Sequence, residues 1–276
     1  MKLTILVDNN TLIDRYFLAE PGLSIHINEN EVNVLFDVGY SDIFIRNAQK
    51  MNISLSQIDF IAISHGHLDH TWGLESLIKY YTELKIEQIQ HKTPTIIGHP
   101  KTFSSIAYPG IPEIGSNISE NKLKKHFELS LKKEPQWITK RLLYLGEIPR
   151  KTKFENNMGL GIKEGEKTED NIPEDSALVY RSDNGLVVIT GCSHSGICNI
   201  IEYAKEICSE EKIFDIIGGL HLQNPSKVQM AGTLKYIKAL DLESIHACHC
   251  TDLKSKIQLS TVAKIEEVGV GLVLNY

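Results

Sequence analysis

Short apolar segments alternate with polar ones over the first eighty residues, and their spacing predicts strands and helices. Strands are expected over four apolar segments: 3–7, 23–27, 32–36 and 58–63. Residues 42–51 repeat apolar side chains at a helical spacing, and residues 71–80 also predict a helix. This order of strand, strand, helix and strand fits the first half of an αββα sandwich, an α/β fold.

The same rhythm returns after residue 176. Strands are expected over 177–181, 186–190, 214–217, 244–247 and 270–274. Helices are expected over 197–208, 227–240 and 253–262. Asp183-Asn184-Gly185 predicts a hairpin turn between the first two of these strands. Three loops in this half each place a histidine at the end of an expected strand.

Between the two halves, residues 81–173 lose this regular pattern. Seven prolines interrupt the segment, and its charged stretch 122–133 predicts a helix. A structureless loop of this length is improbable in a compact domain. We therefore expect 81–173 to form an inserted subdomain, a lid over the active site, with 1–80 and 174–276 as the core.

The stretch Ser64-His65-Gly66-His67-Leu68-Asp69-His70 follows an expected buried strand and holds four side chains that can bind metal. His65 and His67 are two residues apart and can converge on one ion. Asp69 and His70 are adjacent and can reach a second ion. Imidazole and carboxylate ligands suit zinc, iron or manganese.

This stretch resembles the H-x-H-x-D-H motif of the metallo-β-lactamase superfamily, and the resemblance covers nearly the whole chain. Further motifs place it near the dihydropteroate-synthase-like subfamily: LFDVG at 35–39, GEIPRKTKFE at 146–155, EDSALVY at 174–180, GLVVITGCSHSGICNIIEYA at 185–204, IIGGLHL at 216–222 and HACHCT at 246–251. The resemblance implies a four-layer αββα sandwich and two divalent metal ions, with zinc preferred over iron or manganese.

The resemblance also implies a ligand set. His65, His67 and His194 would hold the first ion, and Asp69, His70 and His249 the second. Relatives usually carry a bridging aspartate where IIGGLHL places His221. A neutral imidazole lacks the two bridging oxygens of a carboxylate, so we expect the second ion to be held less tightly. For His221 three roles stay open: a metal ligand, a residue that supports a ligand, or a substrate contact.

Other residues are expected to support this centre or its substrate. Asp37 ends an expected strand, and we expect it to orient a ligand histidine, because such histidines usually donate their second N–H to a carboxylate. Ser195 and Gly196 open an expected helix whose free N–H groups would attract phosphate. The remaining candidates for substrate binding are Arg150, Lys153 and His99.

Two reactions fit such a site. One is hydrolysis of a phosphorylated or other small ester-type substrate, for which a divalent ion activates water. The other, implied by the subfamily, is a transfer that joins a pterin-methyl diphosphate to a ribofuranosylaminobenzene phosphate. A non-catalytic metal-binding or sensor protein is the third alternative, and the intact ligand set argues against it.

Composition and charge indicate which kinds of partner the protein binds. A net charge of −6 disfavours a broad nucleic-acid surface, and no apolar stretch is long enough to span a membrane. The first residues lack the pattern of a signal peptide, so we expect a cytoplasmic protein acting on a small anionic molecule, and a homo-oligomer stays open. The five cysteines are expected to be reduced. Cys192 and Cys250 adjoin expected ligands and either line the site or fill the core as small apolar side chains.

Overall fold

The computed structural model describes residues 1–155, 160–242 and 244–276. The chain forms two compact units, which we describe one at a time. Unit 1 comprises residues 1–132, 160–170 and 269–276, and unit 2 comprises 133–159 and 171–268. Each unit contains one large sheet with helices packed against it, so the mixed α/β fold is confirmed.

Unit 1 contains a seven-stranded sheet. Its strands lie in the order β15 (Val273–Asn275), β1 (Lys2–Val7), β2 (Ser24–Glu29), β3 (Val32–Phe36), β4 (Phe60–Ala62), β5 (Thr95–Gly98) and β7 (Glu128–Leu131). Pairing is antiparallel from β15 to β3 and parallel from β3 to β7. The carboxyl ends of β3, β4 and β5 therefore meet at one edge, where ligands bind in open α/β sheets.

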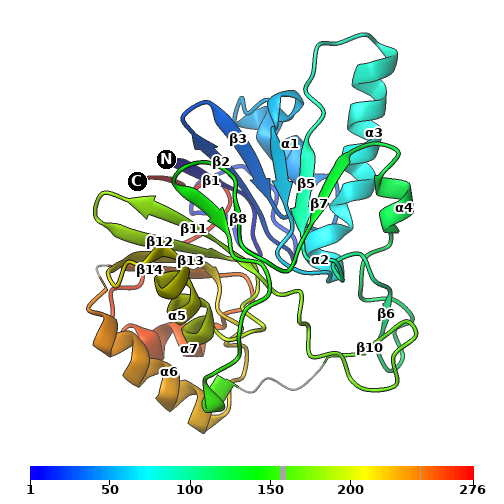
Figure 1. Cartoon of the computed structure of the whole chain (residues 1–276). Helices are drawn as coiled ribbons and strands as arrows, with labels where there is room; N and C mark the ends of the chain where they lie inside the picture. The colour runs from blue at the N-terminus through cyan, green and yellow to red at the C-terminus, as the bar shows by residue number, and fades with distance from the viewer. Residues whose placement is uncertain (156–159, 243) are drawn as a thin grey trace. The chain divides into compact units, whose positions relative to one another are not determined.

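The helices of unit 1 are α1 (Ile43–Lys50), α2 (Leu68–Thr71), α3 (Gly73–Ile86) and α4 (Glu120–Leu123). Figure 1 shows α1 and α3 beside strands β3 to β5. Phe44 and Ala48 of α1 and Leu74 and Leu77 of α3 join Ile61 in one buried cluster. A separate two-stranded sheet pairs β6 (Ile106–Ala107) with β10 (Ile162–Lys163).

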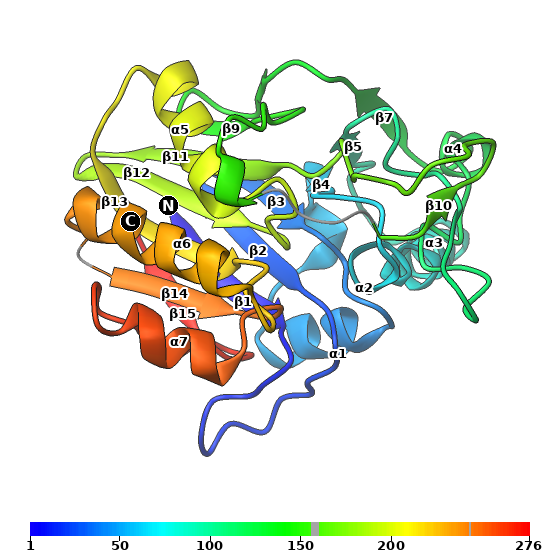
Figure 2. The same ribbon diagram turned by 90° about the horizontal axis from the view of Figure 1, so that it is seen from below.

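Unit 2 contains a six-stranded sheet. Its order is β14 (Ser244–Cys248), β13 (Ile213–Gly219), β12 (Gly185–Thr190), β11 (Ala177–Ser182), β9 (Leu142–Tyr144) and β8 (Gln136–Trp137). The three strands β12, β13 and β14 are parallel, and the others pair antiparallel. Figures 1 and 2 show the helices that accompany this sheet: α5 (Ile197–Cys208), α6 (Lys227–Leu240) and α7 (Leu253–Leu259).

The apolar faces of these helices explain why they pack on the sheet. Ile197, Ile200, Ile201 and Ala204 recur every three or four residues along α5 and are fully or almost fully buried. They join residues of β12, β13 and β14 in the core of unit 2. Short 3₁₀ turns at Leu55–Gln57 and Lys153–Glu155 complete the elements of the two units.

The strands within 81–173, which we expected in one inserted subdomain, divide among three sheets, and only β6 and β10 pair solely with each other. Strands β5 and β7 belong to the large sheet of unit 1, and β8 and β9 belong to that of unit 2. The apolar runs at 95–98 and 142–144 are buried strands, with the prolines in the connections between elements. The helix expected over 122–133 is wrong, because α4 ends at Leu123 and alternating residues from 128 to 131 form β7.

Candidate metal centre

In unit 1 the H-x-H-x-D-H stretch forms the loop after β4 and the start of α2. His65, His67 and His70 are buried, and Asp69 is partly exposed. The His65 Nε2 and His67 Nδ1 atoms lie 3.1 Å apart. Two nitrogens that each bind one tetrahedral zinc at 2.0–2.1 Å lie about 3.3 Å apart. The spacing of these two histidines therefore fits two ligands of a single ion.

Asp37 follows β3 and lies fully buried behind this loop. Its Oδ2 lies 2.7 Å from His70 Nδ1, and the Ser64 hydroxyl and backbone N–H donate to the same carboxylate, each at 2.7 Å. Serine Oγ also lies 2.9 Å from His65 Nδ1. The hydrogen bond between Asp37 and His70 is the one expected of a carboxylate that orients a ligand histidine. The other ring nitrogen, His70 Nε2, lies 3.7 Å from Asp69 Oδ2.

In unit 2 the histidines come from three loops at the carboxyl ends of β12, β13 and β14. Each loop holds one non-glycine residue in the left-handed region: Ser193 at φ +61°, His221 at +50° and His249 at +52°. Such a conformation costs about 1–3 kcal/mol per residue and is concentrated at functional sites. Three neighbouring parallel strands thus end in strained turns.

These loops place histidines and cysteines close together. The rings of His194 and His221 have centroids 4.2 Å apart. His249 Nε2 lies 3.2 Å from Cys192 Sγ, while Cys250 Sγ donates to the Cys192 carbonyl and accepts from the His221 backbone N–H, both at 3.3 Å. Ligand atoms of Cys192, His249 and Cys250 all lie within 4.8 Å of one another. Sequence reasoning had left open whether the two cysteines line the site.

Electrostatics distinguish this cluster from the core cysteines. Burial disfavours a thiolate at Cys250, but contacts with Cys192 and His221 and the charges of His249 and His221 hold the pKa of Cys250 well below its ordinary value. Burial likewise opposes protonation of His221, yet Cys250 and the charge of Asp175 raise its pKa. By contrast, burial raises the pKa of Cys208. Among the described residues, His221 Nδ1 is buried without a hydrogen-bond partner.

The expected phosphate cradle at the start of α5 is already occupied by carboxylates of the chain. Glu155 accepts the backbone N–H groups of Cys198 and Asn199 at 2.9 and 3.0 Å, and Asp175 accepts that of Ser195 at 2.7 Å. A Cβ at Gly196 would meet the Glu155 carboxylate at 2.3 Å. The prediction that Ser195 and Gly196 bind phosphate is therefore wrong for this arrangement, because their helix start already has its anion.

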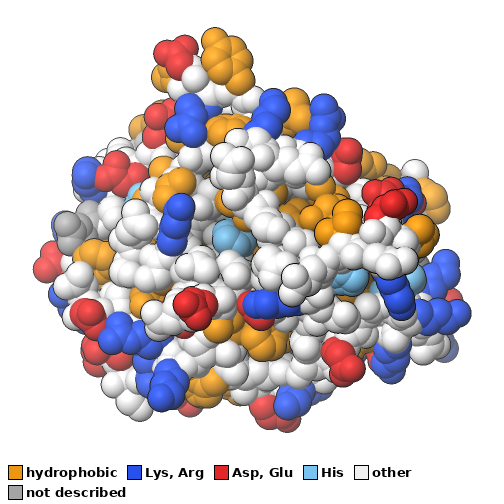
Figure 3. Space-filling view, turned by 90° about the horizontal axis from the view of Figure 1, so that it is seen from above, with side chains coloured by type: hydrophobic (Ala, Val, Ile, Leu, Met, Phe, Trp, Pro, Cys, Tyr) orange, Lys and Arg blue, Asp and Glu red, His pale blue; other side chains and the backbone are white. Residues whose placement is uncertain are grey.

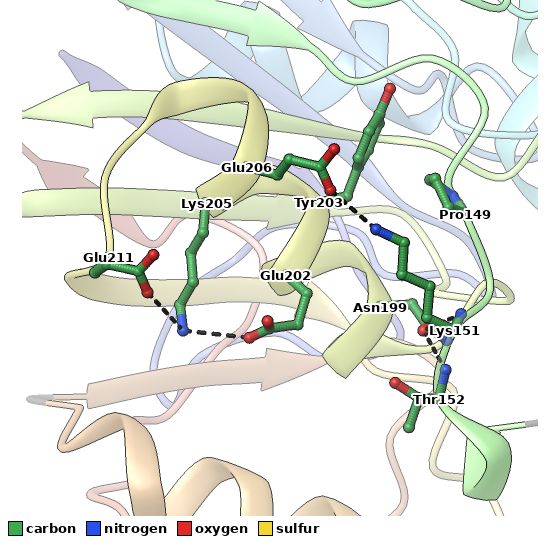
Figure 4. Close-up of a pocket in the computed structure, with 9 residues that line it drawn as sticks. All are labelled: Pro149, Lys151, Thr152, Asn199, Glu202, Tyr203, Lys205, Glu206 and Glu211. Atoms are coloured by element: carbon green, nitrogen blue, oxygen red, sulfur yellow. Dashed lines mark hydrogen bonds and ion pairs between the residues drawn. The ribbon is translucent and has the colours of Figure 1, made fainter.

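The basic residues of the 149–153 segment are also engaged or turned to solvent. The Arg150 guanidinium donates to the Ile172 carbonyl, and Lys153 is exposed. Figure 4 shows the neighbouring Lys151 reaching Glu206 of α5, while Asn199 accepts the backbone N–H groups of Lys151 and Thr152. These contacts line a hollow of about 270 Å³ that contains none of the expected metal ligands.

The last candidate, His99, follows β5 in unit 1 and is fully buried. Its Nδ1 accepts the backbone N–H of Lys101 at 3.0 Å, and its own N–H donates to the Thr102 hydroxyl. These bonds fix the tautomer, since Nδ1 as acceptor leaves Nε2 as the donor atom of the neutral ring. A substrate contact of His99 stays a prediction.

The donor chemistry fits a divalent ion. Unit 1 offers imidazole nitrogens and a carboxylate, and unit 2 offers imidazole nitrogens and thiols, the ligand types of zinc and iron. Sequence reasoning missed Asp175 and Glu155. The EDS sequence before β11 could have indicated a buried acid, but Glu155 meets Cys198 across 43 residues and leaves no local pattern.

Two properties of the chain as a whole bear on its partners. Basic and acidic side chains are interspersed on the face shown in Figure 3. Within the described part of the chain, no helix combines the length and the apolarity needed to cross a bilayer.

Comparison with known proteins adds independent findings. The family profile described as "Metallo-beta-lactamase superfamily" matches residues 19–109. An uncharacterized protein of Methanocaldococcus jannaschii is 32% identical over 98% of both chains. A second protein of that organism, a 7,8-dihydropterin-6-methyl-4-(beta-D-ribofuranosyl)-aminobenzene-5'-phosphate synthase, is 28% identical over 87% of this chain and 84% of its own.

Solved structures give the same result. The crystal structure of Tm1679, described as a metal-dependent hydrolase of the beta-lactamase superfamily, superposes with a TM-score of 0.82. It is 28% identical and covers 100% of this chain and 99% of its own. Unliganded yeast PDE1 shares the fold at 13% identity, with a TM-score of 0.64 and coverage of 100% and 99%.

Proposed function

Since the chain belongs to the metallo-beta-lactamase superfamily, we propose that it is a zinc-dependent hydrolase of a small anionic ester-type substrate, such as a phosphoester. The observation that carries the proposal is the buried group of His65, His67 and His70 with Asp37 behind it. Burying three imidazoles and a carboxylate costs free energy unless they are paired or bind a metal. The 3.1 Å spacing of His65 and His67 supports the second explanation.

The residues take the following roles in this proposal. His65, His67 and His194 hold one ion, and Asp69, His70 and His249 hold the other, as the sequence motifs imply. When bound, divalent ions would lower the pKa of water and neutralise negative charge on a phosphoryl or acyl oxygen.

Asp37 keeps a proton on His70 Nδ1, so that Nε2 presents its lone pair. Ser64 joins this carboxylate to His65. The second hydrogen bonds of both histidines are thus satisfied inside unit 1, which fixes their ring orientations before any metal binds. Such preorganisation favours tight and geometrically selective binding.

A turnover assay tests the proposal. Purified protein is stripped with a chelator, reloaded with zinc, manganese or iron(II), and assayed with nitrophenyl phosphodiester, phosphomonoester and thioester substrates. We expect metal-dependent hydrolysis that His65→Ala abolishes and that His126→Ala, a change at an exposed histidine, leaves unchanged. No turnover of any ester by fully loaded protein would contradict the hydrolase proposal.

A transferase is the second candidate, and the name of the 28% identical synthase favours it. In that case the ions would neutralise a diphosphate leaving group rather than activate water. Supplying a pterin-methyl diphosphate with a ribofuranosylaminobenzene phosphate would then yield a coupled product and one diphosphate per turnover. If the loaded protein neither hydrolyses esters nor forms this product, a non-catalytic metal-binding role becomes the better explanation.

A further inference from the structure

Cys192 and His249 lie in loops 57 residues apart in sequence, yet their side chains face each other. The distance between Cys192 Sγ and His249 Nε2 is 3.2 Å. Zinc binds thiolate sulfur at about 2.3 Å and imidazole nitrogen at 2.0–2.1 Å, so two such ligands of a tetrahedral ion lie about 3.5 Å apart. The observed pair needs a change of only a few tenths of an ångström to bind one ion.

The surroundings of the pair hold it in place. Cys192 is buried, and its carbonyl accepts the Cys250 thiol at 3.3 Å. Gly219 allows Cys250 this position, because a Cβ there would lie 2.6 Å from Cys250 Sγ. His249 keeps a left-handed backbone at φ +52°. A cysteine that merely filled the core would not require a neighbouring strained histidine to point at its sulfur.

Among the expected ligands of the ion bound by His249, only Asp69 is anionic, and His221 can add no more than a neutral imidazole. A thiolate supplies a negative charge and is a soft ligand that prefers zinc or iron(II) to manganese or magnesium.

We propose that Cys192 is a thiolate ligand of the metal ion bound by His249, supplying the anionic donor that His221 does not. This inference rests on the proposed function, since it assumes that His249 binds a metal. When the metal–sulfur bond forms, the Cys192 thiol releases its proton to solvent, and no electron is transferred. Cys250 holds the loops carrying Cys192 and His221 together through its hydrogen bonds to the backbone of both residues.

Cobalt substitution of the full chain tests the proposal without any activity assay. Protein stripped of metal is titrated with Co²⁺, and its absorption spectrum is recorded. Ligand-field bands in the visible report metal binding itself, and a sulfur-to-cobalt charge-transfer band in the near ultraviolet reports thiolate ligation. We expect both in the wild type, with the charge-transfer band lost in Cys192→Ser and retained in the matched control Cys208→Ser, whose thiol lies buried at the far end of α5.

A carboxylate replacement and a measurement on the wild type guard against a misfolded variant. Cys192→Asp should still bind cobalt while losing the near-ultraviolet band. In the wild type, bound zinc should protect Cys192 from alkylation, as read by peptide mass spectrometry, and leave the labelling of Cys208 unchanged. Losing the residue that hydrogen-bonds to a metal ligand already lowers metal affinity about tenfold or more. Losing the ligand itself should cost at least as much, so the zinc affinity of Cys192→Ser should fall by about tenfold or more.

The outcomes separate the two proposals. Ligand-field bands without a charge-transfer band in the wild type would overturn the role of Cys192 and leave the metallohydrolase proposal standing. A charge-transfer band that survives in Cys192→Ser would also overturn it, and its loss in Cys250→Ser instead would assign the ligand to Cys250. If the wild type bound no cobalt or zinc at all, the proposed function and the thiolate ligand would both be wrong.

Discussion

Unit 1 carries its expected ligands in a single loop, whereas unit 2 carries one histidine on each of three loops. In unit 1 the six residues from His65 to His70 follow one strand, and one buried carboxylate, Asp37, orders them. In unit 2 the ligands follow β12, β13 and β14, and each loop contains a left-handed non-glycine residue. The first arrangement concentrates its chemistry in a local motif, and the second depends on the register of three parallel strands.

This difference has energetic consequences. Unit 1 stabilises its histidines with short hydrogen bonds to Asp37 and Ser64. Unit 2 leaves His221 Nδ1 buried without a hydrogen-bond partner among the described residues and has left-handed residues at three strand ends, whereas in unit 1 the strand end at Asp37 has φ +55°. Such strain and unmet hydrogen bonding can be relieved by a bound ion. We therefore expect unit 2 to gain more order than unit 1 when metal binds.

The largest effect is expected from the local motif of unit 1. His65→Ala should lower metal-dependent turnover about a thousandfold or more, because losing an ion removes several kcal/mol of charge stabilisation. Elemental analysis should show one ion fewer per chain, and kinetics with a nitrophenyl ester give the rate. Unchanged metal content in this variant would remove His65 from the ligand set.

A change at His221 tests the strand-end arrangement of unit 2. His221→Asn removes the imidazole but keeps a residue that tolerates a positive φ, and we expect about a hundredfold loss of activity with the first ion retained. His221→Asp should tighten the second site, since a carboxylate adds an anionic ligand with two oxygens. Calorimetric titration with zinc measures both sites, and unchanged second-site affinity and turnover in His221→Asn would show that this histidine is only structural.

Asp37→Asn should have a somewhat smaller effect. The amide cannot accept all the hydrogen bonds that the carboxylate takes from His70 and Ser64, so zinc affinity should fall roughly 10–100-fold. Competition with a chromogenic chelator measures the affinity, and Asp42→Asn, at an exposed helix start, is the control. Equal zinc affinity in Asp37→Asn and wild type would mean that Asp37 does not support the ligands.

The last effect is absent at neutral pH and concerns the stability of unit 1 away from its loop. Burial lowers the pKa of His26 on β2 from 6.5 to about 4. As the pH falls below 6.5, the unfolded chain binds this proton before the folded one does, so stability is lost as the pH falls from 6.5 toward 4. The loss from this one group is at most roughly 3 kcal/mol and vanishes at neutral pH.

Denaturation of metal-free protein at a series of pH values checks this prediction. The free energy of unfolding of His26→Gln should depend less on pH than that of the wild type over this range. The control His126→Gln should follow the wild type, because that side chain is exposed. Parallel curves for wild type and His26→Gln would contradict the assignment to His26.

The sequence predicted the elements that have a clear period and missed those that do not. Helices α5 and α6 begin and end at the predicted residues, because their apolar positions recur regularly. Strands β6, β8 and β10 have two residues each, too few to show any alternation. The range 81–173 was misjudged because its short strands divide among three sheets, two of which also contain strands from outside the range.

The candidate centre shows the same limit. Local spacing was enough to identify His65, His67, Asp69 and His70, and the contact of Asp37 with His70 followed from general metal-site chemistry. The contact between Glu155 and the start of α5 could not be anticipated, because nothing near residue 155 indicates which helix it meets. A glycine and a helix start together suggested a phosphate cradle, and a carboxylate from 43 residues away occupies it.

The edge of the large sheet in unit 1 has a consequence for biosynthesis. Strand β1 pairs on one side with β2 and on the other with β15, which the ribosome makes only after all of unit 2. Until residues 273–275 leave the exit tunnel, the nascent sheet presents an unpaired edge at β1, the kind of surface that joins strands of other chains. Unit 1 therefore completes its large sheet only after all of unit 2 has been synthesised, and its β1 edge stays open to other strands during that interval.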